Sequence, residues 1–188
     1  MTTGPHVPRV RDQVAASLDG FIAPLPGALG PGRADHDWIP ADPDIDFGAL
    51  FAQFDTFLMG RKTFEGMVAQ GQGGASGVFG MRTCVVSRTL APADWPGVRV
   101  VSDDLAGAVA DLKRDASRDI WLFGGGELFA SLLRLGLVDR VEVAVLPVLL
   151  GDGIALSGRV AGERRLRLAG QRTYDKSGTV LLEYDVVR

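Results

Sequence analysis

Short apolar runs recur along the chain, and most are followed by a turn and then by a segment with helical spacing. The runs have the length of buried strands and lie at 9–17, 56–59, 82–86, 98–101, 119–123 and 138–145. Apolar residues spaced by three or four predict helices at 46–54, 61–68, 127–135 and, behind a cap at 102–104, up to about 114. Strands that alternate with helices are joined by right-handed crossovers, which predicts an α/β fold with a mainly parallel central sheet and flanking helices.

The C-terminal part breaks this alternation. Two strand-like stretches, 164–174 and 179–187, flank the turn-forming sequence DKSG at 175–178. This pattern is typical of an antiparallel β-hairpin. We therefore expect a C-terminal antiparallel hairpin at the edge of the sheet.

Two segments rich in glycine or proline, 24–43 and 70–80, predict loops, and the first is long enough to be functional or mobile. The chain has 188 residues, the size of one compact domain. We expect residues 1–8 to form a loose N-terminal tail and residues 9–188 to form a single domain.

Charge and composition exclude several classes of protein. The net charge of −3 argues against a nucleic-acid partner, which needs a basic face. The apolar runs are too short to span a bilayer, and the N-terminus lacks a secretion signal, so we expect a cytoplasmic protein with no membrane partner. The single cysteine, Cys84, lies in an apolar run and predicts a buried thiol rather than a disulfide or a zinc ligand. His36 lies between two aspartates on the long loop, where we predict a solvated side chain and no metal site.

Glycine is the unusual component, at 25 residues. Gly124, Gly125 and Gly126 lie between a predicted strand and a predicted helix. Glycines let the backbone approach a ligand closely, and the N–H groups at a helix start bind phosphate. A tight turn needs one glycine, so we interpret three as a ligand site. Phe129 stands where the dinucleotide fingerprint has its third glycine, so the stretch is not that fingerprint.

Two further strand ends carry groups suited to phosphate, the sequence GRKT at 60–63 and the pair Ser87-Arg88. GRKT lacks the Walker spacing, but it places two cations and a hydroxyl at a helix start, and arginine is the usual partner of a 2′-phosphate. Taken singly, each stretch is better explained as a solvated basic turn or loop than as a ligand site. Because ligands bind at the carboxyl ends of parallel strands, the three stretches together predict a pocket for a nucleotide with several phosphates.

Three motifs give the chain a resemblance to the dihydrofolate reductase superfamily. The motifs are AASLDGFIA at 15–23, MGRKTFE at 59–65 and FGGGELF at 123–129. Further stretches resemble the reductase domain of the bacterial riboflavin-biosynthesis bifunctional deaminase-reductase and its stand-alone relatives; these are SLDG at 17–20, GLVD at 136–139 and PVLLG at 147–151. The resemblance implies a dihydrofolate-reductase-like fold, NADPH as the cofactor and a homodimer.

The resemblance also implies roles for individual residues. Arg61 would hold the 2′-phosphate of the cofactor, and Thr63 its pyrophosphate. Ser87 and Arg88 would flank the adenosine. The rest of the implied cofactor site comprises Ala16 and Ile22 at the nicotinamide, Gly125, Gly126, Glu127 and Leu128 at the pyrophosphate, and, without an individual role, Gly60, Lys62, Phe123 and Gly124.

The substrate end matches the family less well. Folate reductases carry a carboxylate on their first helix and a tyrosine after the glycine triple, where this chain has Phe129. Folate is therefore not the expected substrate. No catalytic residue is assigned; the candidates are Asp19, Asp44 and Asp46, and the candidate substrate contacts are Asp19, Trp38 and Phe123.

These inferences lead to one expected function. We expect hydride transfer from NADPH to a small heterocyclic or sugar-like carbonyl or imine substrate, a reaction resembling that of 5-amino-6-(5-phosphoribosylamino)uracil reductase. Two alternatives stay open, dihydrofolate reductase and a non-catalytic NADPH-binding protein.

Overall fold

The computed structural model describes residues 6–25, 27–29, 36–74, 77–158, 160 and 162–188. Parts of the predicted tail and of both predicted loops lie outside this range, at 1–5, 26, 30–35 and 75–76. The strands are β1 (Val10–Ser17), β2 (Phe21–Ala23), β3 (Phe54–Gly60), β4 (Gly73–Gly74), β5 (Gly77–Val78), β6 (Arg82–Val86), β7 (Val98–Val101), β8 (Asp119–Leu122), β9 (Arg140–Leu146), β10 (Ile154–Ala155), β11 (Leu166–Tyr174) and β12 (Thr179–Val186). The helices are α1 (Phe47–Phe51), α2 (Arg61–Ala69), α3 (Leu105–Asp115), α4 (Gly126–Arg134) and the 3-10 helix η1 (Pro92–Asp94).

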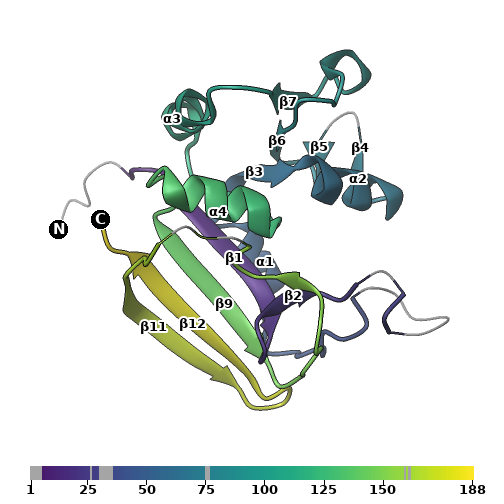
Figure 1. The fold of residues 1–188 in the computed structure, drawn as a ribbon, viewed down its shortest axis with the longest axis vertical. Helices are drawn as coiled ribbons and strands as arrows, with labels where there is room; N and C mark the ends of the chain where they lie inside the picture. Colours follow the sequence, from purple (N-terminus) through teal and green to yellow (C-terminus); the bar gives the residue numbers. More distant parts are fainter. Residues whose placement is uncertain (1–5, 26, 30–35, 75–76, 159, 161) are drawn as a thin grey trace.

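Eight of the described strands form one sheet in the order β11-β12-β9-β1-β8-β3-β6-β7 (Figure 1). The first strand lies inside the sheet, and β1 pairs in parallel with both β8 and β9. The pairs β3–β8, β3–β6 and β6–β7 are also parallel. β11 and β12 form an antiparallel hairpin that adds to β9 at the edge. These pairings confirm the predicted α/β fold and its C-terminal hairpin.

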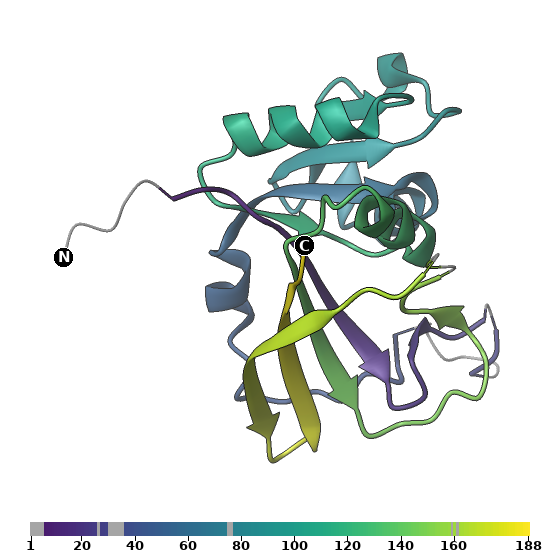
Figure 2. The ribbon, with the colours of Figure 1, turned by 60° about the vertical axis from the view of Figure 1, so that its left-hand side comes forward.

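Helices cover the sheet on both faces. α3 and α4 pack on one face, where Val109 and Leu132 join a core with Val10 and Ile120. α2 packs on the other face, and its Phe64 belongs to a second core cluster. The hairpin and β9 extend away from the helices (Figure 2). No helix in the described part of the chain is long and apolar enough to cross a bilayer.

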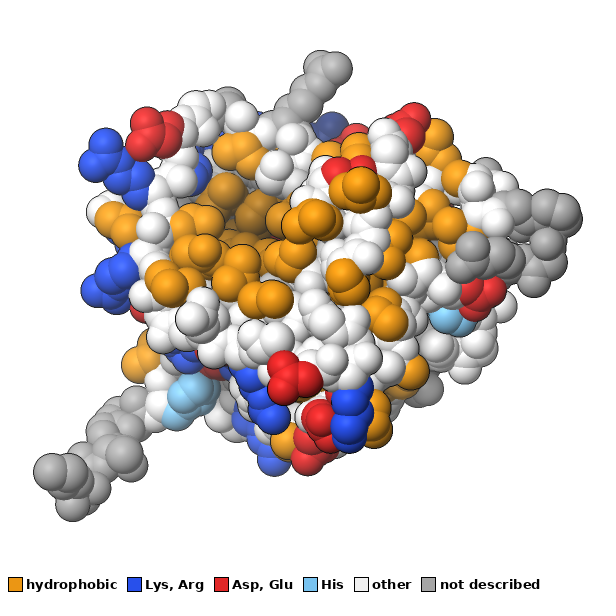
Figure 3. All heavy atoms as spheres, turned by 90° about the horizontal axis from the view of Figure 1, so that it is seen from below, with side chains coloured by type: hydrophobic (Ala, Val, Ile, Leu, Met, Phe, Trp, Pro, Cys, Tyr) orange, Lys and Arg blue, Asp and Glu red, His pale blue; other side chains and the backbone are white. Residues whose placement is uncertain are grey.

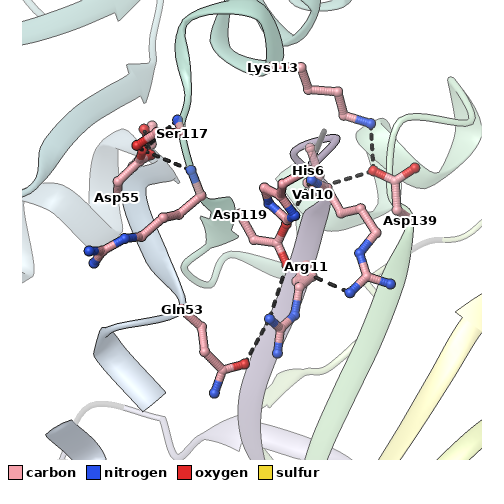
Figure 4. A network of polar contacts seen from close by, with 12 residues as sticks. His6, Val10, Arg11, Gln53, Asp55, Lys113, Ser117, Asp119 and Asp139 are labelled. Carbon is pink, nitrogen blue, oxygen red and sulfur yellow. Dashed lines mark hydrogen bonds and ion pairs between the residues drawn. The ribbon is translucent and has the colours of Figure 1, made fainter. Parts of the chain in front are cut away.

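A buried ion network ties the central strand to both of its neighbours. The Arg11 guanidinium donates to both carboxylate oxygens of Glu142 on β9, each at 2.8 Å, and to Asp119 on β8 at 3.1 Å. It also donates to the side chain of Gln53 at 2.9 Å (Figure 4). Glu142 is completely buried, so its charge needs the guanidinium beside it. The network therefore holds β1, β8 and β9 in one register.

Two predicted elements differ from the structure. The helix predicted at 46–54 ends at Phe51, because Phe54 begins β3 and pairs with β8. The Phe54 ring packs on Trp121 with centroids 4.7 Å apart, so sheet packing explains the apolar spacing that predicted a longer helix. The predicted loop 70–80 contains the short antiparallel strand pair β4–β5.

Two further ionisable side chains, which lie outside the Arg11 network, are buried within the sheet. Cys84 is 1% exposed, as predicted, and burial raises the pKa of its thiol to about 11. Asp12 is 2% exposed. Asp12 lies on the same face of β1 as Val10 and Val14, which pack against the core under α3 and α4. Burial, with the charge of Glu142 adding to it, raises the pKa of the Asp12 carboxyl to about 8.

We predict that Asp12→Asn stabilises the protein increasingly as the pH rises from about 4 to about 8. The unfolded Asp12 ionises near its ordinary pKa of 3.8, whereas the folded one keeps its proton to about 8, so raising the pH favours unfolding of the wild type. At about 1.4 kcal/mol per pKa unit, the variant should gain about 3 to 5 kcal/mol over this range. Urea unfolding at several pH values measures the gain. The exposed Asp175→Asn serves as the control, and a gain for Asp12→Asn that does not vary with pH would contradict the prediction.

Candidate functional site

A large groove of about 2260 Å³ runs along the sheet. Pockets for one small ligand hold roughly 300–1,000 Å³, so this groove has room for a cofactor and a substrate together. We call one part the cofactor end; it is lined by the turns at 60–63, 86–88, 101–105 and 123–128. We call the other part the substrate end; it is lined by residues of 39–51 and by parts of β1, β9, β11 and β12.

The three predicted strand ends lie together at the cofactor end. Gly60 pairs with Val86 and Val86 with Val101, so β3, β6 and β7 end at one level of the sheet. Thr63 Oγ1 lies 3.7 Å from the point that a Cβ on Gly125 would occupy. The first turn of α2 therefore adjoins the glycine turn before α4, and the structure brings the sequence-predicted residues together.

Helices α2 and α4 begin without a side-chain cap. Their N-cap residues, Gly60 and Gly125, have no side chain to accept a first-turn amide. By contrast, α1 and α3 are capped by Asp46 and Asp104, each of which accepts a backbone N–H of the first turn. The first N–H groups of an uncapped helix are available to an anion. Both uncapped helix starts line the groove, which makes the cofactor end a suitable site for phosphate.

Each glycine of the 124–126 turn also has a structural reason. Gly124 and Gly125 have φ of +75° and +94°, a region that other residues rarely adopt. A Cβ on Gly126 would lie 2.5 Å from the carbonyl oxygen of Ala155. The interpretation that one glycine would suffice for this turn is therefore wrong. The evidence for a phosphate site is the pair of uncapped helix starts, not the number of glycines.

Cationic side chains line the same end of the groove, namely Arg61, Lys62 and Arg88. Arg61 Nη1 donates to the carboxylate of Glu65 at 2.9 Å, one turn further along α2, and the arginine stays 42% exposed. Arg61 is thus held near the helix start while its guanidinium remains accessible. The Ser87 hydroxyl accepts the amides two and three residues later at 3.1 and 2.9 Å, so it shapes the turn that carries Arg88.

The predicted contacts at the nicotinamide and the substrate divide into two groups. Ile22 and Phe123 line the groove. Ala16 is 2% exposed and lies in the core with residues of α4. Trp38 is also buried, and neither it nor Ala16 is among the residues that line the groove in the described part of the chain.

The three candidate acids all have structural partners. Asp19 accepts the Ser17 hydroxyl at 2.6 Å and two amides of the loop 147–151, and these hydrogen bonds hold its pKa below the ordinary range. Asp44 is exposed and pairs with a lysine of the hairpin turn at 2.9 Å. Asp46 lines the groove, but its carboxylate caps α1. A catalytic role for any of the three stays a prediction.

Sequence reasoning missed most of the substrate end. Gln13, Tyr174 and Glu183 line it, from β1, β11 and β12. Alternate residues of a strand face opposite sides of a sheet, and only the tertiary pairing decides which side meets α1. No local pattern therefore marks these residues. At the cofactor end, Asp103 lines the groove; it belongs to the cap predicted at 102–104, in which the structure assigns the capping role to Asp104.

Comparisons with known proteins identify relatives of the chain. The family model of the RibD C-terminal domain matches residues 8–180. The uncharacterized protein YyaP of Bacillus subtilis (strain 168) is 31% identical over 193 residues, which cover 98% of each chain.

Solved structures share the fold. A protein from Shewanella sp. PV-4 assigned to riboflavin biosynthesis has a TM-score of 0.77 at 24% identity, covering 96% of this chain and 99% of that one. The diaminohydroxyphosphoribosylaminopyrimidine deaminase/5-amino-6-(5-phosphoribosylamino)uracil reductase of Thermotoga maritima has a TM-score of 0.63 at 20% identity, and the match covers 57% of its length. Both likenesses confirm the predicted fold.

We predict that Gly126→Ala destabilises the protein by about 1 to 3 kcal/mol, because its Cβ would press on the backbone of 155–158. Gly60→Ala is the matched control at the other open helix start. Its φ is −82° and its Cβ would meet no atom within 4 Å, so it should cost less than about 1 kcal/mol. Urea unfolding compares the two variants. Equal stability would show that 155–158 does not pack on the start of α4.

Proposed function

The chain belongs to the RibD C-terminal domain family, and from this membership and the groove we propose that it is an NADPH-dependent reductase of a small heterocyclic or sugar-like carbonyl or imine compound. The family membership implies an oxidoreductase of the riboflavin-pathway reductase type. One observation carries the cofactor proposal: two uncapped helix starts and three cationic side chains meet at one end of a groove that is large enough for two ligands.

The residues of the cofactor end fit the phosphates of NADPH. The amides at the start of α4 and the Thr63 hydroxyl beside them would hold the pyrophosphate. Arg61 would hold the 2′-phosphate, because a guanidinium donates two parallel hydrogen bonds to such a group. Arg88 would lie at the adenosine, on the turn that Ser87 shapes.

When bound, NADPH supplies the hydride, and this chain supplies position. Phe123 directly precedes the glycine turn, and its ring lies 5.3 Å from that of Trp121, which in turn lies 5.3 Å from the ring of Phe51 in the substrate end. It therefore joins the two ends of the groove. Ile22 lines the groove from β2 and would pack on the nicotinamide ring. Holding both reactants in one groove converts an encounter in solution into a reaction between aligned neighbours.

The substrate end does not support folate. Helix α1 reads FGALF and contains no ionisable residue. The acid nearest to it, Asp46, already caps the helix with its carboxylate. A free carboxylate on this helix, which the folate alternative requires, is thus missing from α1, and we do not propose dihydrofolate as the substrate.

We predict that Arg61→Ala weakens NADPH binding by roughly tenfold to a hundredfold and changes NADH binding by less than about threefold. The reason is that a charge-assisted hydrogen bond contributes about 1.5 to 3 kcal/mol, and NADH lacks the 2′-phosphate that would accept it. Titration followed by cofactor fluorescence measures both affinities.

Arg118→Ala is the matched control, since Arg118 is an exposed arginine beside the Arg11 network rather than the cofactor end. It should leave both affinities unchanged. Equal binding of NADPH and NADH by the wild type, or no loss of NADPH affinity in Arg61→Ala, would overturn the cofactor proposal. Oxidation of bound NADPH by a substrate then separates a reductase from a protein that only binds the cofactor.

We also propose a homodimer. Seen from below, apolar side chains gather around a hollow on the side of the molecule where β9, β12 and β11 lie (Figure 3). Leu168 on β11 is 53% exposed and pairs in register with Tyr184 of β12. Arg167 and Asp185, on the same two strands, form an ion pair and give this part of the sheet both signs of charge. A surface with both signs is self-complementary, as a two-fold interface requires.

Sedimentation velocity is expected to give twice the 20.0 kDa mass of one chain. Leu168→Asp should shift the protein toward the monomer, because it would bury an unpaired charge in the interface. Leu149→Asp, at a leucine that is 70% exposed in the loop after β9, should leave the dimer intact. A monomeric wild type would refute the homodimer and leave the cofactor proposal standing.

A further inference from the structure

The segment 36–46, which leads into α1, forms one side of the substrate end. Ile39, Pro40 and Ile45 line the groove from it. The segment contains no helix or strand, and its backbone hydrogen bonds are local, for example the one from the Ile39 amide to the carbonyl of His36 at 3.0 Å. A segment of this kind opens at low cost unless a contact with the rest of the molecule holds it.

A buried carboxylate ties this segment to the C-terminal hairpin. Among residues 36–46, all of which the structure describes, only Trp38 and Asp42 are buried. One oxygen of the Asp42 carboxylate accepts the amide of Asp44 at 2.9 Å, within the segment itself. The other oxygen accepts the amide of Ser177 at 2.8 Å, 135 residues further along the chain in the turn between β11 and β12. We call this carboxylate and its two amide donors the Asp42 clamp.

The clamp is built on a charged group. Burial alone would raise the pKa of the Asp42 carboxyl, but the hydrogen bonds from Asp44 and Ser177 and the charge of Lys176 hold it below its ordinary 3.8. The carboxylate is therefore ionised at neutral pH, and charge-assisted hydrogen bonds are stronger than neutral ones. Lys176 also pairs with Asp44 at 2.9 Å, but both side chains are more than half exposed, so this ion pair adds little.

The hairpin turn that receives the clamp is fixed by its own hydrogen bonds. The Ser177 hydroxyl donates to that of Thr179 at 2.8 Å, and Thr179 is buried at the start of β12. The Gly178 amide donates to the carbonyl of Tyr174 at 2.9 Å, which closes the turn. Tyr174 and Thr179 both line the groove. Asp42 therefore joins two sides of the substrate end that lie far apart in the sequence.

We infer that Asp42 is a positioning residue, which holds the segment 36–46 as a fixed wall of the substrate end before any ligand binds. Both of its oxygens are hydrogen-bonded to amides, so the carboxylate acts through the wall that it holds. The inference rests on the proposed function for the existence of a substrate, and it deepens that function because a wall fixed in advance lowers the entropic cost of binding. The clamp itself can be tested without a substrate.

Amide hydrogen exchange followed by NMR tests the clamp. The reporters are the amides of Ile39 and Ile45, each of which donates to the carbonyl three residues earlier and keeps this acceptor in every variant. Asp42→Ala leaves no acceptor for the Ser177 amide, so both reporters should exchange about a hundredfold faster than in the wild type. Asp42→Asn keeps one acceptor oxygen, and the increase should be only about tenfold.

Three controls separate positioning of the wall from a general loss of stability. The amide of Ile120, which is bonded inside the sheet, should change less than the reporters do. Asp55→Asn is the matched variant, because the Asp55 carboxylate also accepts two amides, those of Ser117 at 2.8 Å and Arg118 at 3.0 Å, away from the groove. It should leave the reporters within about twofold of the wild type. Lys176→Ala, which removes only the exposed ion pair, should change them by less than about threefold.

Addition of NADP⁺ distinguishes a fixed wall from a lid. Saturating the wild type with NADP⁺ should leave both reporters within about twofold of their rates in the free protein, because the wall is already in place. A wild type that does not bind NADP⁺ refutes the proposed function and leaves the comparison of variants standing. The inference is overturned if Asp42→Ala exchanges as the wild type does, if Asp55→Asn or the Ile120 amide shows an equal increase, or if NADP⁺ slows the reporters by about tenfold or more.

Discussion

The buried guanidinium of Arg11 is the constraint on which the rest of the groove depends. It joins β1 to Glu142 on β9 and to Asp119 on β8, so three central strands share one polar anchor. Removing one partner of a buried ion pair leaves an uncompensated charge, which costs about 3 to 5 kcal/mol. A slip of β9 by one residue would separate Glu142 from Arg11 and turn Ala144 to the opposite face. The anchor thus keeps Ala144 on the side of the sheet that lines the groove.

The cofactor end depends on two helix starts, those of α2 and α4, whose first backbone N–H groups have no capping side chain. α1 and α3 use an aspartate cap, whereas the helix starts proposed to hold phosphate have glycine instead. The fold closes the backbone of 155–158 against Gly126 and leaves the amides on the groove side without a capping side chain. Rigid packing behind an open helix start is what preorganised anion binding requires.

The aromatic residues show how one cluster serves both the core and the groove. Phe54 and Phe57 are buried, Trp121 is 5% exposed, and Phe79 is half-exposed. Contacts among these rings connect the interior to the surface of the groove without a break. Stability and ligand shape are therefore coupled here, because a substitution in the inner rings would move the outer ones.

The sequence by itself determined the α/β class, the hairpin, the buried thiol and the cofactor-end motifs. Each of these depends on local periodicity or on a short motif at a strand end, which is readable without knowing the fold. The helix predicted at 46–54 is longer than α1, because Phe54 belongs to β3 and pairs with β8, a long-range contact that the local pattern does not contain. The same limit hid Gln13 and Glu183, whose side of the sheet is decided by strand pairing. Only the tertiary structure could show that Gly126 is required by the distant segment 155–158 and that the Phe79 ring packs on that of Phe51, because both depend on contacts between residues far apart in the chain.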